Sequence, residues 1–434
     1  MSVKVTFVGA GSVVFSKQLM MDILSTPELE DTSFSLYDID PERLETAKLI
    51  CEDLVQSLGN KATVTTSLDR KEALRGADFV VNMIQVGMHE ATLLDFQIPA
   101  KYGLKQTIAD TTGVGGIFRG LRTLPVMLSM VEEMAEVCPD AYLLNYTNPM
   151  PINCLGLFLA MKEKGLDIKT VGLCHSVQGT AKQLAGYLKV PYEELEYFVA
   201  GINHMSWFLT LKHNGKDLYP ALFEAMEDPE IYKTNKVRFE IMRHFGYFVT
   251  ESSEHMAEYT AFFIKDPKLI EELDIPINEY ITRSERNLKS YAEIREKVLR
   301  GEHLEVETSH EYASGIIKAI TTGKPWSFNG NFLNEGLIDN LPRDCAVEVP
   351  CLVDRSGIHP CHVGSLPPQL AGLNLTNINV HRLTAEAFLT GKKEYLYHAV
   401  ALDPLASSML NLDQMRAMVD ELVEAHGDAL PKLS

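Results

Sequence analysis

The stretch Lys4-Val-Thr-Phe-Val8-Gly9-Ala10-Gly11-Ser12 decides the fold, because an apolar strand pattern runs directly into two closely spaced glycines. A helical pattern follows to about Ser25. Such glycines let a strand–helix turn tighten and let the backbone approach a pyrophosphate at the helix N-terminus. Val14 stands where the common fingerprint has a third glycine, which only loosens helix–strand packing. The turn predicts a dinucleotide site using Gly9, Gly11 and Ser12; the alternative is an α/β glycine turn that binds no nucleotide.

The next strand pattern, at residues 33–37, ends in Asp38. A carboxylate at this position accepts hydrogen bonds from the ribose hydroxyls of a bound nucleotide and repels a 2′-phosphate. NAD is therefore the expected cofactor, in preference to NADP.

Strand and helix patterns alternate through roughly the first 175 residues. Further strands are predicted at residues 62–66, 77–84, 141–145 and 170–173, and helices at residues 42–58 and 151–164. Almost wholly apolar strands separated by helices are typical of a parallel sheet that is covered on both faces. The first part of the chain is therefore predicted to be a doubly wound, Rossmann-type α/β fold.

The pattern changes beyond about residue 185. A hairpin is predicted from residues 208–213 and 216–219, turning at Asn214-Gly215. Residues 346–353 form another strand pattern, and helices are predicted at residues 278–300, 305–321, 367–390 and 413–426. We therefore expect an NAD-binding domain in residues 1–185 and a second, α+β domain with the substrate and catalytic groups in residues 186–434.

The composition of the 434 residues excludes several classes of partner. The formal net charge of −19 disfavours nucleic acid and anionic membrane surfaces, which both require a basic face. Neither a signal peptide nor an apolar run long enough to span a bilayer is expected. The seven cysteines are scattered and odd in number, which indicates reduced thiols and a cytoplasmic location.

Two residues in the middle of the chain could hold a metal ion. Cys174 follows the strand predicted at residues 170–173, at the carboxyl edge where such sheets place ligands, and His204 lies in Gly201-Ile-Asn-His204. An ordinary buried cysteine and a structural histidine are the alternatives. As a pair they would leave most of a coordination shell to substrate and water, which is what catalysis requires.

Three polar segments could complete a site. Asn148 of Asn145-Tyr-Thr-Asn148-Pro149 suits a sugar diol or, equally, a turn before proline. Asp110 opens a glycine-rich loop that could orient a substrate; Asp110 or Thr112 could instead only cap the following helix. The run from Glu251 to Tyr259 is dense in acid–base groups, which a solvated helix start would also explain.

In this order the motifs resemble glycoside hydrolase family 4, the NAD- and divalent-metal-dependent glycosidases. They are Gly9-Ala-Gly11-Ser12, Tyr37-Asp38-Ile-Asp40, Asp110-Thr-Thr-Gly-Val-Gly-Gly, Asn145-Tyr-Thr-Asn-Pro, Cys174-His-Ser-Val and Gly201-Ile-Asn-His204. The resemblance runs essentially end to end, and it implies a fold similar to that of lactate and malate dehydrogenases. Cys174-His-Ser-Val looks like the α-galactosidase (melibiase) branch. The family's phospho-α- and phospho-β-glucosidases carry Asp or Asn after this cysteine, so His175 argues against a phosphorylated substrate.

The resemblance implies an unusual mechanism, since this family is an exception to hydrolysis by a carboxylate pair. Bound NAD⁺ would oxidise C3 of the sugar, which acidifies the proton on C2. Removal of that proton expels the glycosidic oxygen; water then adds, and NADH reduces C3 again. NAD is thus recycled.

The same resemblance assigns roles to individual residues. Cys174 and His204 would hold Mn²⁺ or another divalent ion against the C2 and C3 oxygens, and Asn148 would hold sugar hydroxyls. Tyr259 resembles the family's tyrosine base. His175 and Asp110 are rival candidates for protonating the leaving oxygen. Family members also suggest a homodimer or homotetramer.

Three alternatives remain open at this point. The first keeps the family and changes the sugar, to an α-glucoside or an α-galacturonide, although a uronic acid needs a basic residue that the sequence does not locate. The second is a plain 2-hydroxyacid dehydrogenase, which needs no metal and reduces NAD⁺ stoichiometrically. The third is an NAD-sensing protein without catalysis.

Overall fold

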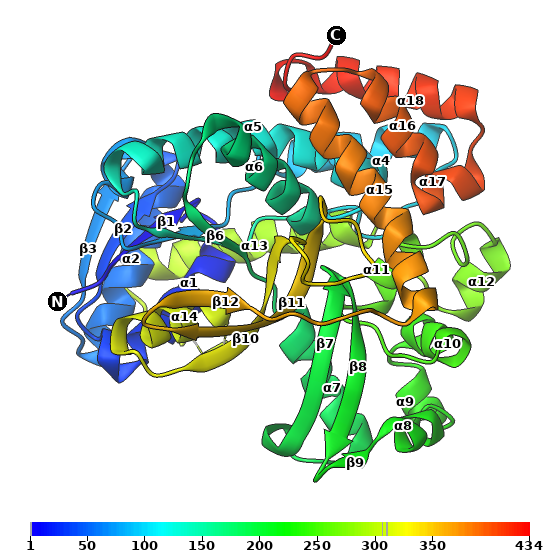
Figure 1. The fold of residues 1–434 in the computed structure, drawn as a ribbon. Coiled ribbons are helices and arrows are strands. Elements are labelled where there is room, and N and C mark those ends of the chain that lie inside the picture. The colour runs from blue at the N-terminus through cyan, green and yellow to red at the C-terminus, as the bar shows by residue number, and fades with distance from the viewer. Residues whose placement is uncertain (1, 306, 310) are drawn as a thin grey trace.

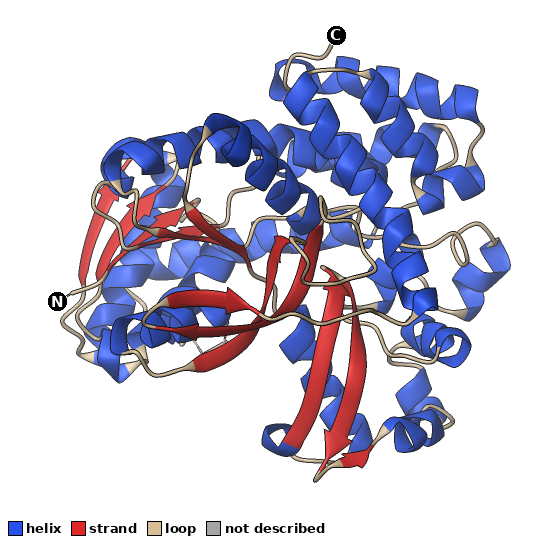
Figure 2. Ribbon diagram, viewed as in Figure 1, coloured by secondary structure: helices blue, strands red, loops and turns tan. Residues whose placement is uncertain are grey.

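The computed structural model describes residues 2–434 except 306 and 310. The described residues form one mixed sheet of 12 strands in the order β3-β2-β1-β4-β5-β6-β10-β11-β7-β8-β9, with β12 paired to β11. Helices cover both faces of its parallel part, and the C-terminal helices pack together at one end of the molecule (Figures 1 and 2).

The parallel half of the sheet confirms the doubly wound prediction. The central strand β1 (Lys4–Val8) lies between β2 (Ser33–Tyr37) and β4 (Phe79–Asn82), and β3 (Thr63–Ser67), β5 (Tyr142–Asn145) and β6 (Lys169–Gly172) complete the parallel set. Successive residues of β1 point to opposite faces, so Phe7 packs in one apolar core and Val8 in another. This alternation requires helices on both sides of the sheet.

The helices of this half are α1 (Val13–Leu24), α2 (Pro41–Leu58), α3 (Arg70–Leu74), α4 (Met88–Lys101), α5 (Gly113–Val137) and α6 (Met150–Lys164). Local signals set their ends. The Asp40 side chain accepts from the backbone N–H of Glu42 and Arg43, Pro41 fills the first helical position, and Gly59 ends α2 at φ 67°. Buried side chains of α1 and α2 belong to the core that contains Phe7, whereas those of α3 belong to the other core.

Antiparallel strands extend the same sheet. β6 adjoins β10 (Trp326–Leu333), which pairs with β11 (Ala346–Asp354). β11 also pairs with β12 (Gly357–Pro360) and with β7 (Leu195–Ile202), and β7 forms a hairpin with β8 (Met205–His213), followed by β9 (Lys216–Asp217). Because the sheet runs through both halves, a domain boundary at residue 185, inside α7 (Ser176–Leu188), stays a prediction.

The remaining helices surround this extension. They are α8 (Tyr219–Ala225), α9 (Pro229–Tyr232), α10 (Lys236–Phe245), α11 (Ser253–Glu258), α12 (Pro267–Glu272), α13 (Glu279–Leu299), α14 (Tyr312–Thr322), α15 (Pro368–Thr390), α16 (Glu394–Leu402), α17 (Pro404–Met409) and α18 (Leu412–His426). Three-residue 3₁₀ turns occur at Pro27–Leu29, Tyr192–Glu194 and Gly427–Ala429.

Three sequence predictions differ from the structure. The helix predicted at residues 305–321 begins only at Tyr312, and residues 306 and 310 of that segment lie outside the described residues. The second hairpin strand stops at Asp217, because Pro220 at the start of α8 favours a helix there. By length and composition α5 could span a membrane, contrary to expectation, but 78% of its most apolar window is buried inside the fold, as in a core helix.

Candidate functional site

The turn after β1 is held by backbone contacts. The N–H groups of Gly9 and Ala10 both donate to the carbonyl of Tyr37, at 3.0 Å, and Gly9 takes a φ of 84°. The N–H of Gly11 donates to Asp38 Oδ2 at 2.8 Å. A Cβ at Gly11 would stand 2.7 Å from that oxygen, so only glycine fits. The turn opens directly into α1, as a pyrophosphate site requires.

Asp38 lies at the carboxyl end of β2 and is 9% exposed. Its Oδ1 accepts from the N–H of Asp40 at 3.0 Å, while Oδ2 holds Gly11. Asp38 therefore links the glycine turn to the end of the neighbouring strand. Ser12 is exposed beside this turn, and its N–H donates to the Gly9 carbonyl.

Cys174 and His204 lie side by side, although they are 30 residues apart in the sequence. The Cys174 Sγ lies 3.3 Å from Nε2 of His204. Cys174 follows β6, and His204 lies in the tight turn between β7 and β8, so separate parts of the sheet bring the two donors together. Burial raises the pKa of the Cys174 thiol. Burial also lowers the pKa of His204, to about 4, which leaves an imidazole with a free lone pair.

The second nitrogen of His204 faces a different residue. Its Nδ1 lies 3.4 Å from the Tyr259 hydroxyl, and Tyr259 is completely buried. Burial raises the pKa of Tyr259 well above its usual value, and the carboxylate of Asp110 adds to the increase. His204 itself has φ 65°, a left-handed conformation that non-glycine residues hold only where surrounding contacts fix it.

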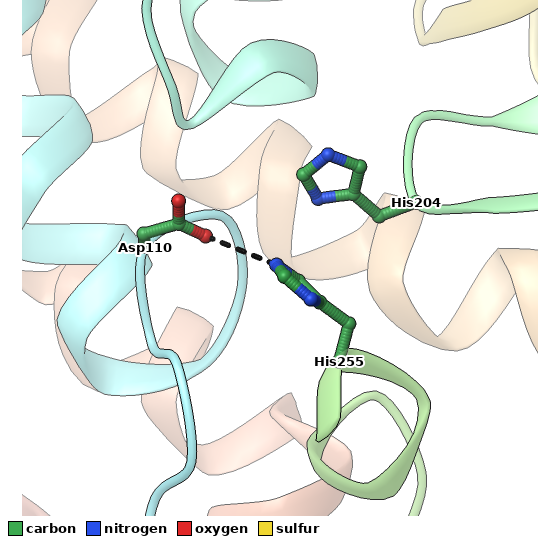
Figure 3. A group of neighbouring side chains, drawn as sticks. All are labelled: Asp110, His204 and His255. Carbon is green, nitrogen blue, oxygen red and sulfur yellow. Dashed lines mark ion pairs between the residues drawn. The ribbon is translucent and has the colours of Figure 1, made fainter. Parts of the chain in front are cut away.

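Asp110, His204 and His255 form a compact group of possible metal donors. One donor atom from each residue lies within 4.8 Å of the others, and all three side chains are buried. Figure 3 shows Asp110 and His255 pointing toward each other below the His204 ring, from three separate segments of the chain. The His255 Nε2 is buried, has no hydrogen-bond partner among the described residues, and lies 3.5 Å from Asp110 Oδ1.

His255 is oriented by a second carboxylate. Its Nδ1 lies 2.6 Å from Glu251 Oε2 and 3.0 Å from the Ser252 hydroxyl. Burial alone would lower the pKa of His255, but Glu251 and Asp110 outweigh that effect and raise it well above the usual range. The pKa of Glu251 is raised by burial but lowered more strongly by His255, and the net change is well downward.

Both oxygens of Asp110 are engaged. Oδ2 accepts from the Asn148 side-chain amide at 3.0 Å, and Oδ1 accepts from the Thr111 hydroxyl at 2.8 Å while facing His255. Burial raises the pKa of Asp110, but His255 lowers it by more, so the group is a carboxylate at neutral pH. The structure thus brings the predicted Asp110 and Asn148 into direct contact.

His175 follows Cys174 but, unlike the buried donors, is exposed. Its Nδ1 lies 3.0 Å from Glu311 Oε1, and its side chain is 61% exposed while Glu311 is buried. The hydrogen bond to Glu311 raises the pKa of His175 to about 10. A protonated imidazole at the mouth of a site can donate a proton to a leaving group.

The side chains present fit a divalent ion. A thiol and a neutral imidazole 3.3 Å apart are donors that Mn²⁺ or Zn²⁺ accepts, and the carboxylate of Asp110 lies close to the same imidazole. An ion there would also favour the thiolate form of Cys174. The glycine turn likewise fits a dinucleotide pyrophosphate.

Sequence reasoning did not assign Glu251, His255 or Glu311 individually. The run Glu251-Ser-Ser-Glu-His255 carried a usable signal, because residues four apart share one side of a helical turn. Glu311 carried none, because its pairing with His175 depends on the packing of α14 against the sheet.

Comparison with known proteins identifies the family. Residues 4–190 match the model of family 4 glycosyl hydrolases, and residues 199–406 match the C-terminal domain of that family. An α-galactosidase of Bacillus subtilis is 47% identical over 99% of both chains. An α-galactosidase of Rhizobium meliloti is 37% identical over 99% of this chain and 90% of the relative. An α-galacturonidase of Lachnoclostridium phytofermentans is 28% identical over 99% of this chain and 97% of the relative.

Solved structures agree on the fold. A 6-phospho-α-glucosidase from gut microorganisms, in complex with NAD and Mn²⁺, superposes with a TM-score of 0.84 at 22% identity over the whole of both chains. A 6-phospho-β-glucosidase of Thermotoga maritima, with manganese, NAD⁺ and glucose-6-phosphate, gives 0.82 at 22% identity, again over both whole chains. A malate dehydrogenase of Plasmodium falciparum gives 0.52 at 15% identity over 89% of this chain and 98% of the other, which confirms the predicted likeness of fold. With both of its family models matched in order and a relative 47% identical across its length, the chain belongs to glycosyl hydrolase family 4 and is a glycoside hydrolase.

Proposed function

We propose that this glycoside hydrolase is an α-galactosidase that depends on NAD and on a divalent metal such as Mn²⁺. The observation that carries the proposal is the 3.3 Å approach of Cys174 Sγ to His204 Nε2, in the fold that also forms the glycine turn. The α-galactosidases among its relatives, and the His that follows Cys174, favour a non-phosphorylated galactoside.

The bound groups would supply redox and Lewis-acid chemistry: NAD⁺ accepts a hydride from C3 and returns it, and the ion polarises the C2 and C3 oxygens. Gly9, Gly11, Ser12 and Asp38 would hold the cofactor. Cys174 and His204 would hold the ion, and Asn148 would bind the sugar hydroxyls. Asn148 is already fixed for this task by its hydrogen bond to Asp110.

Proton removal from C2 is assigned to Tyr259 in this proposal. Its hydroxyl lies against His204, so it reaches the region of the metal donors. Its pKa is raised by burial in the absence of a cation, and a divalent charge nearby acts in the opposite direction.

His175 is the proposed general acid. It is exposed, whereas both oxygens of Asp110 are engaged by neighbouring side chains. The Glu311 carboxylate keeps the imidazole protonated at neutral pH, which is the form that donates to a leaving oxygen. Asp110 then acts as the fixed negative charge that orients Asn148 and His255.

The test is release of p-nitrophenol from its α-galactoside, with and without NAD⁺, Mn²⁺ and a thiol reductant. Turnover that needs all three additions, without net formation of NADH, is expected because the hydride returns to C3. Stoichiometric accumulation of NADH on a 2-hydroxy acid would instead identify a dehydrogenase, and NAD binding without any turnover would identify a sensor.

One observation favours a second substrate, an α-galacturonide. Arg119 of α5 donates from Nε to the Asn148 carbonyl at 3.2 Å and from Nη1 to the Tyr280 hydroxyl at 2.7 Å. Arg119 lies beside Asn148, so it is a candidate for the basic residue that a uronic acid requires and that the sequence did not locate. Comparing kcat/KM for p-nitrophenyl α-galactoside and α-galacturonide decides between them; a preference for the acid that Arg119→Gln abolishes would establish the galacturonidase.

We also propose a cytoplasmic location and a homodimer or homotetramer. None of the seven cysteines forms a disulfide, which agrees with a reducing compartment. Light scattering of the purified protein measures the assembly directly.

A further inference from the structure

A buried carboxylate behind the site contacts none of the groups assigned above through its own oxygens. Glu258, the last residue of α11, is 2% exposed. Its Oε2 accepts from the backbone N–H of Thr107 at 3.0 Å and of Ile108 at 3.2 Å, and its Oε1 accepts from the N–H of Ala109 at 2.8 Å. Three successive N–H groups around one carboxylate make a tight, directional anion cradle.

The backbone segment that Glu258 holds leads directly into the site. Ala109 immediately precedes Asp110 and has φ 47°, a left-handed conformation that is strained for an alanine. Such a conformation persists only where neighbouring groups determine it. The bond from the Ala109 N–H to Glu258 is the contact that holds this residue, and the conformation of Ala109 sets the direction in which Asp110 leaves the backbone.

Through the backbone, Glu258 is also connected to the turn that carries His255 and Tyr259. Tyr259 follows it in the chain, and His255 lies one helical turn before it. The Thr107 hydroxyl adds a bond to the Glu254 carbonyl at 2.7 Å. Glu258 thus fixes the distance between the segment that ends in Asp110 and the turn that carries His255 and Tyr259.

We propose that Glu258 is a positioning residue that holds Asp110 against His255 and Asn148 through the backbone of Thr107–Ala109. The inference rests on the proposed function for its catalytic consequence. Without this anchor Asp110 loses its fixed orientation, and the amide of Asn148 loses the partner that aims it at the sugar. A misplacement of about 1 Å of such groups lowers turnover on the order of 100-fold.

The first test is Glu258→Gln. The amide has the same size, but its NH₂ cannot accept from a backbone N–H, so at least one of the three bonds is lost. We expect kcat on p-nitrophenyl α-galactoside to fall about 100-fold, with the dissociation constant of NAD unchanged. The matched control is Asp403→Asn: Asp403 is equally buried and close enough to Glu258 to feel its charge, but it caps α17 through the N–H of Ala406. This variant removes a neighbouring charge and none of the three bonds to residues 107–109, so kcat should be retained. An equal loss in both variants, or none in Glu258→Gln, would overturn the proposal.

The second test needs no substrate. Hydrogen–deuterium exchange should accelerate at the amides of residues 107–109 in Glu258→Gln and not in Asp403→Asn; unchanged exchange would refute the anchor. Ala109→Gly in the Glu258→Gln background should restore part of kcat, because glycine adopts a positive φ without strain. If the glutamine variant does not fold, Glu258→Asp keeps the charge, withdraws the oxygens and carries the same expectations. An unmodified protein inactive on α-galactosides would refute the proposed function, and exchange would still decide the anchor.

Discussion

The turn after β1 and the donor group around His204 are built in opposite ways. The turn consists of consecutive residues, and its contacts are mainly backbone hydrogen bonds, to which the side chains of Asp38, Arg43 and Ser16 add one bond each. The donor group draws Asp110, His204 and His255 from separate segments, and Cys174 approaches His204 from a fourth. His204 itself has a positive φ, and so do two residues beside the group, Ala109 and Glu251. A site assembled in this way depends on buried polar contacts, whereas a contiguous turn carries its own geometry.

The largest expected effect comes from removing a metal ligand, which should lower turnover strongly and leave NAD binding unchanged. Cys174→Ser and His204→Ala should each lower turnover by about 1,000-fold or more, because loss of a ligand removes several kcal/mol of charge stabilisation. NAD binding, followed by fluorescence titration, should stay close to that of the unmodified protein, since the glycine turn is untouched. Near-normal activity of either variant in chelator-treated buffer would show that the pair does not hold the metal.

The next test asks which group of the donor region removes the C2 proton. Tyr259→Phe should reduce kcat about 100-fold, in the range for loss of a general base, while the ring packing remains. Turnover in D₂O should place deuterium at C2 of the released sugar, measured by NMR. Absence of label in the sugar would argue against elimination, and a small effect of the substitution would transfer the role to another group of the segment of residues 251–258.

A smaller, substrate-dependent effect is expected at the mouth of the site. His175→Gln should slow hydrolysis of alkyl α-galactosides strongly and of the p-nitrophenyl substrate only about 10-fold or less, because a good leaving group needs little protonation. The pKa of His175 is raised by Glu311 to about 10, so the acid form persists until that pH.

Glu311→Gln removes the group that raises this pKa, so the alkaline fall of kcat should move to lower pH, toward the ordinary imidazole range. The matched comparison is His213, which pairs with Glu194 on the exposed hairpin; Glu194→Gln should leave the pH profile unchanged. A profile that responds to neither variant would assign the acid role elsewhere.

The smallest expected effect concerns NAD binding at the glycine turn after β1. Asp38→Ala should weaken NAD binding about 10-fold, the value of one hydrogen bond to a charged group, and narrow the preference over NADP. Asp38→Asn keeps an acceptor for the Gly11 N–H but removes the charge, so it should mainly change the preference. At saturating NAD⁺ both variants should turn over normally. Equal affinity of the unmodified protein for NAD and NADP would contradict the role given to Asp38.

The sequence predicts the parallel half of the fold closely, for a physical reason. Strands β1 and β2 were expected at the residues where they occur, because each is an apolar run that ends at a glycine or an acidic residue. Strand β7 was not expected: Glu196 interrupts its apolar run, and the strand is defined by pairing with β8 and β11. Tertiary pairing, rather than local pattern, decides such strands.

The residues of the site likewise fall into two groups, those that the sequence predicts and those that it does not. Cys174 and His204 could be proposed because each follows a recognisable motif, and the structure brings them into contact. The pairing of His255 with Glu251 and Asp110, and the anchor at Glu258, depend on loops whose courses are set by buried hydrogen bonds. The contacts of His255 with Asp110 and of Glu258 with Ala109 connect segments well over a hundred residues apart, so motif spacing carries no information on them. The pair His255–Glu251 is local, and its spacing of four residues carried the one usable signal.

The strand order has a consequence for how the protein is made. The hairpin β7–β8, whose turn contains His204, joins the sheet through β11, which is synthesised long after it. During translation the N-terminal parallel strands can pair as they emerge, whereas this hairpin has no neighbouring strand until β10 and β11 leave the ribosome. Val199 and Phe208 pack with α7 and other residues before 250, but the residues of the hairpin that belong to the main core, such as Ile202 and Trp207, wait for later parts of the chain. The metal donors are therefore among the last features of the nascent chain to reach their final positions.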